Sequence, residues 1–587
     1  MADNTASSTG AAEPAQADRF RRWSNRFHAW RAARSSPATA FASQPQPRMV
    51  GDAARGRQLM AGNILLAGEL VEAPGLLPWD IAMPSSAFEG ALHGFRWLDD
   101  LAAIGTADAR STAQAWTWDW IDRFGKGKGA GWTPDRTGRR LIRWISHAVL
   151  LLRGRPQADS AAFFAVLGRQ TLFLSRRWHA AAPGLPRFEA VTGLIYAGLS
   201  LEGMERYIAP ALDALDNDCA TQIDDQGGIA TRNPEDLLEV FALLSWTAQV
   251  LTEAGHTPSQ AHKNALERIA PTLRALRHAD GGLARFNGGG AGEEGRLDQA
   301  LAASHVRPGL LPEGLAMGYA RLTAGRTSLI VDAAAPPTGP ASANAHAGTL
   351  AFELTSGRRP VIVNCGSGAA FGETWRRAGR ATPSHSTLAI EGVSSSQLAL
   401  PDETGAVPKG SDYLETVPKH VTAQSKRTSR GWQLLVGHDG YGPSHGLTHV
   451  RNLLLSLDGR TLSGEDLLGA LDNTQKRKFD SEQPHHDMQG TPFILRFHLH
   501  PEVDAIHDMN GTAISIALRS GEVWIFRHNG KAALTLEPSV YLEPGRLKPR
   551  ACKQIVLRAR VTDYAMRIVW TLAKAQDTPQ AVRDVED

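Results

Sequence analysis

The spacing of apolar residues changes once along this chain of 587 residues, and that change limits the fold more than any other feature. From about residue 80 to 280, apolar side chains recur every three or four positions, which is the period of an amphipathic helix. After about residue 325, apolar and polar side chains alternate, which is typical of a strand with one buried face. The sequence therefore predicts a helical half followed by a β half.

The helical half carries explicit start signals. Asn233-Pro234-Glu235-Asp236 combines an N-cap side chain, a proline at the first helical position and two acids in the first turn. Short connections between segments of similar length favour antiparallel helical hairpins, arranged as a superhelix or a closed ring. We expect helices over residues 85–104, 107–124, 137–152, 160–179, 186–201, 205–219, 234–254 and 258–278.

Short runs with a period of two follow one another in the second half without helical patterns between them. Turn pairs such as Asp458-Gly459 and Asn529-Gly530 favour two-residue hairpins. Consecutive strands without crossover helices predict an antiparallel sandwich rather than a parallel sheet. The expected strands are 349–354, 360–364, 386–390, 432–436, 450–457, 493–499, 513–518, 523–526 and 532–536.

The domain boundaries follow from these patterns and from the composition of the ends. Residues 1–18 are rich in Ala, Ser, Thr, Pro and Gln and are expected to be disordered. The Ala- and Pro-rich stretch 333–340 marks the junction of the two halves. We divide the chain into a tail with a basic amphipathic helix (1–48), a helical domain (49–325), a β domain (326–575) and a C-terminal tail (576–587).

The basic helix lies between residues 18 and 34, where four aromatic residues recur at helical spacing among six arginines. The simpler interpretation is that this helix packs its aromatic stripe on the domain behind it. The alternative is a peripheral contact with an anionic membrane surface. The stripe consists of Phe20, Trp23, Phe27 and Trp30.

Charge and composition exclude several classes of protein. The 63 Lys and Arg residues nearly balance 60 Asp and Glu residues, so no nucleic-acid partner is expected from bulk charge. Three widely spaced cysteines form neither a disulfide framework nor a CxxC zinc module. The first residues lack the basic and apolar regions of a secretory signal, which predicts a cytoplasmic location.

Polar residues that can carry chemistry gather near the start of the β half. They lie in Asn344-Ala345-His346-Ala347-Gly348, in residues 363–368 and in residues 375–387. Two histidines, an amide, a thiol and three arginines can form an anion-binding groove with acid and base groups. The alternative for each histidine is a hydrogen bond to backbone at a strand end. The arginines are Arg376, Arg377 and Arg380.

Three motifs in this region, residues 345–354, 361–366 and 384–392, resemble the heparinase II/III family of polysaccharide lyases. The resemblance implies a multidomain α + β protein with an N-terminal (α/α) toroid of helical hairpins and a C-terminal antiparallel β-sandwich. It also implies an acidic, uronate-containing polysaccharide or oligosaccharide as partner. Such a polymer is cleaved by β-elimination, in which a base removes the C5 proton and the bond to the C4 oxygen breaks.

The resemblance assigns roles to the polar residues of the β half. His346 or His385 is the expected base, and Asn344 stands where the family usually has its catalytic histidine. Asn287 and Asn344 are expected to hold the uronate carboxylate. The three arginines named above are expected to bind acidic groups of the substrate.

The helical half matches the family less closely. A gapless match from Gly227-Gly228 places Glu235 under the family's catalytic Asn or His and Asn233 under the serine of the family motif, and Asn233 is expected to bind the substrate. Asn233 is equally interpretable as the N-cap of the helix that it precedes. Tyr319 is the nearest phenol to the expected catalytic tyrosine, and its alternative role is that of a packed core residue.

No cofactor is required for this chemistry, but family members hold a structural zinc ion. The equivalent residues here are His346, Asn364 and His385, and Asn364 replaces the usual aspartate. The set is weak because the carboxylate charge is missing. Cys365 is an alternative ligand, although neighbours on a strand point to opposite faces.

Three functions remain open. The first is a lyase that cleaves an acidic polysaccharide. The second is a catalytically inactive carbohydrate-binding or envelope-assembly protein on the same fold. The third is a scaffold whose residues 18–34 dock on a membrane or partner. The predicted location is the cytoplasm, the family resemblance gives the periplasm or cell envelope as the alternative, and the oligomeric state is not predicted.

Overall fold

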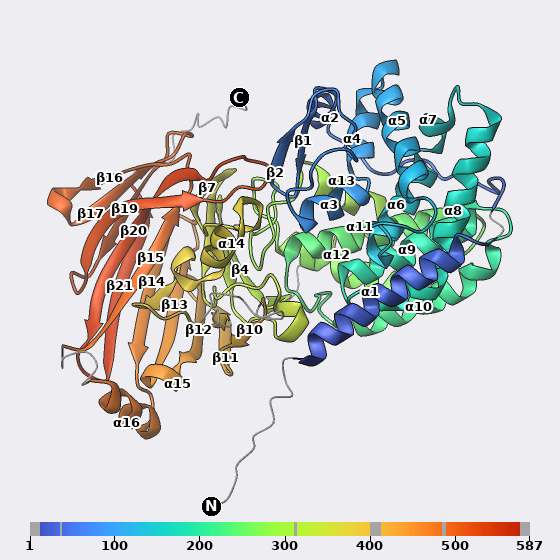
Figure 1. The fold of residues 1–587 in the computed structure, drawn as a ribbon. Helices are drawn as coiled ribbons and strands as arrows, with labels where there is room; N and C mark the ends of the chain where they lie inside the picture. Colours follow the sequence, from blue (N-terminus) through green and yellow to red (C-terminus); the bar gives the residue numbers. More distant parts are fainter. Residues whose placement is uncertain (1–11, 36–37, 310–313, 399–411, 484–488, 576–587) are drawn as a thin grey trace, which may run out of the picture. The chain divides into compact units, whose positions relative to one another are not determined.

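The computed structural model describes residues 12–35, 38–309, 314–398, 412–483 and 489–575, with side chains described from Arg19 onward. The chain divides into two compact units (Figure 1). Unit 1 is helical and contains residues 1–224, 239–267 and 302–306; unit 2 contains 225–238, 268–301 and 307–587. Residues 1–11 of the tail expected at 1–18, and the whole tail expected at 576–587, lie outside the described residues.

Every helical segment that we predicted is confirmed. The segment 107–124 is one helix with the predicted bounds, whereas 85–104 is interrupted at Phe95, where φ is +61°. Local capping explains two starts, because Ser85 Oγ accepts from Phe88 N and Thr106 Oγ1 accepts from Ala109 N. The helices are α1 (Ala12–Ala32), α2 (Ala53–Met60), α3 (Ser86–His93), α4 (Trp97–Ile104), α5 (Ala107–Phe124), α6 (Pro134–Ser146), α7 (Ala148–Leu152), α8 (Gln157–Arg177), α9 (Leu185–Ser200), α10 (Ile208–Thr221), α11 (Pro234–Glu253), α12 (Gln260–Ala275) and α13 (Arg296–Ala303).

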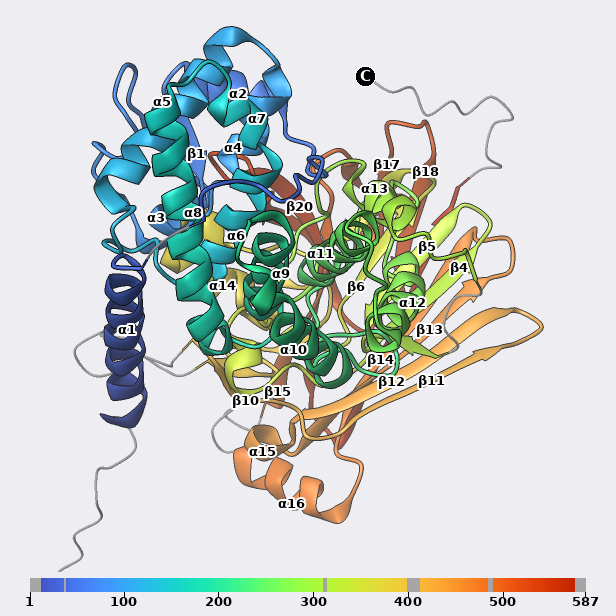
Figure 2. The same ribbon diagram turned by 90° about the vertical axis from the view of Figure 1, so that its right-hand side faces the viewer.

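Helix α1 packs on unit 1 with its small and polar face and leaves its aromatic stripe in solvent. Ala29 and Ala32 are buried, and Arg177 Nε of α8 donates to Asn25 Oδ1 at 2.9 Å. Helix α1 runs alongside α8 (Figure 2). The preferred prediction, an aromatic stripe buried on the domain, is therefore wrong. The stripe is exposed to 67, 61, 42 and 50% at Phe20, Trp23, Phe27 and Trp30.

The close approach of the backbone at Gly127 to the backbone of α1 at Ala29 explains why α1 packs with its small and polar face. A Cβ atom added at Gly127 would lie 2.6 Å from the carbonyl oxygen of Ala29, so only small residues fit between α1 and the body of the unit. Helix α1 also begins at Ala12, so residues 12–18, which we expected to be disordered, are helical. Alanine, glutamate and glutamine are good helix formers, and Pro14 is tolerated in the first turn.

Unit 2 is dominated by the predicted antiparallel sandwich, and each predicted run overlaps an observed strand. One sheet has the order β11 (Val421–Arg427), β12 (Gly431–Tyr441), β13 (Leu447–Ser456), β14 (Thr461–Gly469), β21 (Ala565–Lys574), β18 (Val523–His528), β17 (Ala513–Ala517) and β16 (Asp504–Asp508). The other has the order β19 (Ala533–Tyr541), β20 (Arg550–Val561), β15 (Thr491–Leu499), β7 (Arg359–Val363), β6 (Phe352–Ser356), β5 (Thr327–Asp332), β4 (Tyr319–Ala324) and β3 (Leu315–Ala316), with β8 (Leu388–Ile390) paired to β15.

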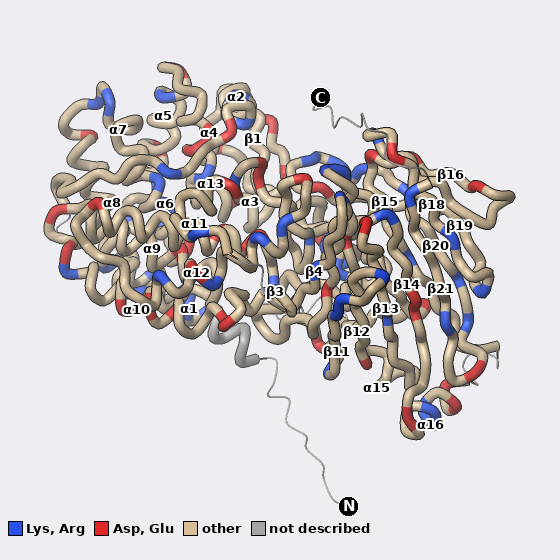
Figure 3. Tube along the Cα trace, turned by 180° about the vertical axis from the view of Figure 1, so that it is seen from behind, with Lys and Arg blue, Asp and Glu red and all other residues tan. Residues whose placement is uncertain are grey.

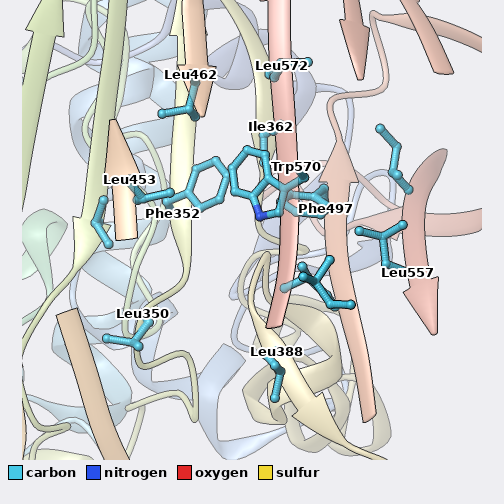
Figure 4. Close-up of a cluster of buried hydrophobic side chains, with 14 of the residues drawn as sticks. Leu350, Phe352, Ile362, Leu388, Leu453, Leu462, Phe497, Leu557, Trp570 and Leu572 are labelled. Carbon is cyan, nitrogen blue, oxygen red and sulfur yellow. The ribbon is translucent and has the colours of Figure 1, made fainter. Parts of the chain in front are cut away.

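The core of the sandwich is apolar and closely packed (Figure 4). Phe352 of β6 stacks on Trp570 of β21 with ring centroids 6.1 Å apart, and Phe497 of β15 meets the same indole edge-on at 4.8 Å. These contacts join the two sheets, because β21 belongs to one sheet and β6 and β15 to the other.

Short elements complete the described chain. Strands β3 and β4 lie before residue 325, so the sheet starts earlier than the change of period suggested. The small elements are the hairpin β1 (Asn63–Leu66) and β2 (Glu69–Glu72), the pair β9 (Gln397–Leu398) and β10 (Leu414–Thr416), and the helices α14 (Glu373–Arg380), α15 (Gly442–His445) and α16 (Asn473–Glu482).

Charges of both signs are interspersed over each unit (Figure 3), in keeping with a net charge of only +3. In the part of the chain that the structure describes, no helix is both long and apolar enough to cross a bilayer.

Candidate functional site

The two candidate histidines lie side by side in unit 2. His346 Nδ1 and His385 Nε2 are 3.0 Å apart, and His385 Nδ1 lies 2.9 Å from the carbonyl oxygen of Ala381. A carbonyl can only accept, so His385 carries its proton on Nδ1 and accepts on Nε2. His346 therefore donates from Nδ1 and keeps the lone pair on Nε2.

Both imidazoles are neutral at physiological pH. Burial lowers the pKa of His385 to about 4. Burial, together with the neighbouring His385 and the positive charge of Arg380, holds the pKa of His346 well below its usual value. Among the described residues His346 Nε2 has no hydrogen-bond partner. A neutral imidazole with an unengaged lone pair can accept a proton.

Asn287 links three of the candidate residues. Its amide nitrogen donates to Tyr319 Oη at 2.7 Å, and its Oδ1 accepts from the backbone N–H of His346 at 3.1 Å. Tyr319 Oη in turn donates to the carbonyl oxygen of Arg232 at 2.6 Å. Tyr319 is buried, and burial raises the pKa of its phenol. The single hydroxyl proton of Tyr319 is already donated to the carbonyl oxygen of Arg232. In this arrangement the phenol cannot also donate that proton to the leaving oxygen of a substrate.

Arg232 organises this part of unit 2, and the sequence analysis missed it. Its guanidinium pairs with Asp332 at 2.6 Å and donates to the carbonyl oxygens of Met317, Gly318, Ala334 and Ala335. All five donors of the side chain are used, and the charge lies 4.7 Å from the ring centroid of Tyr319. Arg232 and Asp332 are 100 positions apart in the sequence, so no local sequence pattern predicts that they pair.

The two candidates at the start of α11 are also engaged within the protein. Asn233 Oδ1 accepts from the backbone N–H groups of Glu235 and Asp236 at 2.9 and 3.3 Å, which is the N-cap geometry that we gave as its alternative role. Glu235 Oε2 accepts from Gly290 N at 2.7 Å. Asn233 therefore caps α11, and Glu235 holds the loop that contains Gly290.

The arginines of α14 differ in their surroundings. Arg380 is buried and donates to the carbonyl oxygens of Ala345 and Ser342, both at 2.7 Å, and burial lowers its pKa to about 10. Arg376 pairs with Asp412 at 2.9 Å, and Arg377 is half-buried on the same helix. Asn344 is exposed at the turn that Arg380 supports. Arg380 thus holds the backbone that carries His346.

The residues expected at a zinc site do not fit a structural zinc ion. Asn364 Oδ1 accepts from Ser386 N at 2.9 Å, while Cys365 Sγ lies 3.5 Å from His498 Nδ1. Within the described ranges no group of three or more His, Cys, Asp or Glu side chains could hold a metal ion. A structural zinc site needs four ligands, and the expected set here consists of two imidazoles and one neutral amide.

Replacing Asn364 by aspartate is expected to create a zinc site. The amide nitrogen of Asn364 is buried without a partner in the described structure, so an oxygen there removes an unsatisfied donor and adds the missing charge. After chelator treatment, N364D should bind added zinc at least about tenfold more tightly than the unaltered chain in calorimetric titration. The double variant N364D/H385A is the control, and equal zinc affinity of N364D and the unaltered chain would contradict this expectation.

Comparisons with known proteins agree with this architecture. Residues 306–571 match the family model described as heparinase II/III-like, C-terminal. FtsZ-localized protein C from Caulobacter vibrioides is 31% identical over 552 residues, which cover 94% of this chain and 92% of that protein. Crystal structures of heparinase III (TM-score 0.66, 12% identity) and of a mutant heparan sulfate lyase HepC from Pedobacter heparinus (TM-score 0.58, 13% identity) each align with 97% of this chain and 92% of their own chain. The chain therefore belongs to the heparinase II/III-like family and has the polysaccharide-lyase fold, an (α/α) toroid followed by an antiparallel β-sandwich.

Proposed function

We propose that this chain is a non-catalytic envelope-assembly protein that works on an anionic membrane surface while retaining the lyase fold. The observation that carries the proposal is the exposed aromatic face of α1. Successive rings of the stripe lie 6.0, 5.8 and 6.1 Å apart, so they form one continuous apolar strip. Large exposed apolar strips are rare on proteins that work alone in water.

Charge supports a membrane as the partner of this strip. Residues 19–34 contain six arginines and no acidic residue. Interfacial helices combine aromatic residues on one side with basic residues that meet anionic headgroups. Arg34 also lies over the ring of Trp30 at 3.6 Å, which keeps a cation at the edge of the stripe.

The polar network of unit 2 supports a non-catalytic role. Tyr319, Asn287, Asn233, Glu235 and Arg380 all hydrogen-bond to other groups of the protein. Each of these groups therefore already has a structural partner within the protein. The Caulobacter relative is named for its localisation with FtsZ, and we extend that location to this chain.

Two measurements test the proposal together. The full chain should sediment with vesicles of phosphatidylcholine and phosphatidylglycerol and much less with phosphatidylcholine alone. It should also release no unsaturated product, detected by ultraviolet absorbance, from heparan sulfate, chondroitin sulfate or polygalacturonate. Absence of sedimentation with the anionic vesicles refutes the membrane role, and product release refutes the non-catalytic role.

A second candidate function is polysaccharide β-elimination, and the unengaged Nε2 of His346 favours it. A neutral imidazole at that position has the lone pair that a base needs. If the chain is a lyase, H346Q should lower kcat by about 100-fold or more without changing the unfolding transition. An unchanged rate in H346Q would remove His346 from the reaction.

A further inference from the structure

Basic side chains gather where α1 meets the end of α8 in unit 1. His28 and Arg31 come from α1, Arg176 and Arg177 end α8, and His179 follows in the next turn. Arg31, Arg176 and His179 are exposed, whereas Arg177 is buried in its bond to Asn25. The docking of α1 on α8 thus places cations from two helices on one surface.

The positive charges of this surface act on the imidazole of His28. Its Nδ1 atom is enclosed and has no hydrogen-bond partner within the described residues. Burial, Arg177, Arg176, Arg31 and His179 all lower the pKa of the imidazole. An anion bound beside these cations would reduce the repulsion among them.

The position of His28 on the helix relates this surface to the membrane. At 3.6 residues per turn, His28 lies on the side of α1 that carries the buried Ser24 and Ala32, and Arg31 lies between that side and the aromatic stripe. Aromatic side chains that enter the acyl boundary would therefore bring this cluster to the level of the lipid phosphates. Phosphate oxygens match the N–H donors of arginine and histidine.

We propose that His28, Arg31, Arg176 and His179 form a binding site for the phosphate of an anionic phospholipid headgroup. The inference rests on the proposed membrane role, because insertion of the aromatic stripe would bring this cluster next to the bilayer surface. Because α1 is already folded and docked on α8 through Asn25, the site is assembled before the membrane is met. The backbone of the site therefore does not have to fold on binding, which reduces the entropy lost when the headgroup binds.

The site has a predictable pH dependence. The groups that face His28 are Arg31 on α1, Arg176 and Arg177 on α8, and His179 in the following turn. A bound phosphate counters these charges and raises the pKa of His28 relative to the free protein, so the bound state takes up a proton. Binding should therefore strengthen as the pH falls through the range between the free and bound pKa values.

The experiment measures vesicle binding as the phosphatidylglycerol fraction of phosphatidylcholine vesicles increases. We expect R176Q to weaken binding to anionic vesicles about fivefold and to leave binding to neutral vesicles unchanged. R153Q is the matched control, because Arg153 is an exposed arginine of the same unit outside the cluster. H28Q should bind anionic vesicles with less dependence on pH than the unaltered chain.

The possible failures can be told apart. If R176Q and R153Q bind equally well, the phosphate site is refuted while the membrane role stands. If the unaltered chain binds no vesicle, the proposed function itself fails. Tight binding of glycerol 3-phosphate without vesicles, or self-association that R176Q abolishes, would assign the cluster to a soluble phosphate ester or to a second copy of the chain and overturn the lipid assignment.

Discussion

Replacing Trp23 and Phe27 by serine is expected to release the chain from anionic vesicles and to leave its fold intact. Both rings are exposed in the structure, so the folded protein loses little packing when they are removed. When the helix binds a membrane, the apolar surface of each ring leaves water. This burial contributes about 1.5 kcal/mol or more per side chain to the free energy of membrane binding. The double variant W23S/F27S should therefore bind about 100-fold more weakly in a sedimentation assay.

The matched control removes exposed apolar side chains elsewhere in unit 1. Val149 on α7 is exposed to 66% and Leu76 to 56%, so V149S/L76S makes a similar change away from α1. Circular dichroism should show unchanged helix content in both double variants, because neither pair packs in the core. Equal vesicle binding by the two variants would show that the stripe does not enter the membrane.

Replacing Asp466 by asparagine is expected to lower the free energy of unfolding by about 3–5 kcal/mol. The carboxylate is fully buried in the sandwich and accepts from His449 Nε2 at 2.7 Å, Arg451 Nε at 2.7 Å and Trp570 Nε1 at 2.8 Å. Arg451 also donates to the carbonyl oxygens of Leu350 and Ser386. Asparagine keeps the shape but leaves the buried charge of Arg451 uncompensated.

Urea unfolding measures this loss, and its pH dependence has a defined sign. Burial opposes ionisation of Asp466, but Arg451 and the hydrogen bond from His449 outweigh it and hold the pKa well below its usual value. In the unfolded chain this carboxyl has a pKa of about 3.9. The stabilisation that the ionised Asp466 gives the folded protein is therefore complete above that pH and declines as the pH falls toward the folded pKa. The difference in stability between the unaltered chain and D466N should then be constant from about pH 5 to 7 and shrink below about pH 4.

The exposed Asp504 provides the control for this experiment. It pairs with Lys553 at 3.4 Å on the surface, and exposed pairs contribute little to stability. D504N should therefore unfold nearly as the unaltered chain does. An equally small effect of D466N would show that the buried carboxylate does not stabilise the sandwich.

Local patterns in the sequence were sufficient for the framework of this protein. The single change of period predicted the helical and β halves, because hydrogen bonding within a helix or a strand imposes its own repeat on buried side chains. The Asn233-Pro234 pair predicted the start of α11 for the same reason, since a cap bonds to N–H groups two and three positions away. The motifs around His346 and His385 correctly indicated the family.

Tertiary contacts decided everything that depends on residues far apart. The period of α1 shows that its apolar residues share one side, but the close approach of Gly127 to Ala29 selects the opposite side for packing and leaves the stripe in solvent. Arg232 and Asp332 meet across 100 positions, and Asn287 binds Tyr319 and His346 from a third segment. Nearby spacing constrains only neighbours within a turn or strand, whereas the partners of a buried polar group are set by which distant segments are packed against it.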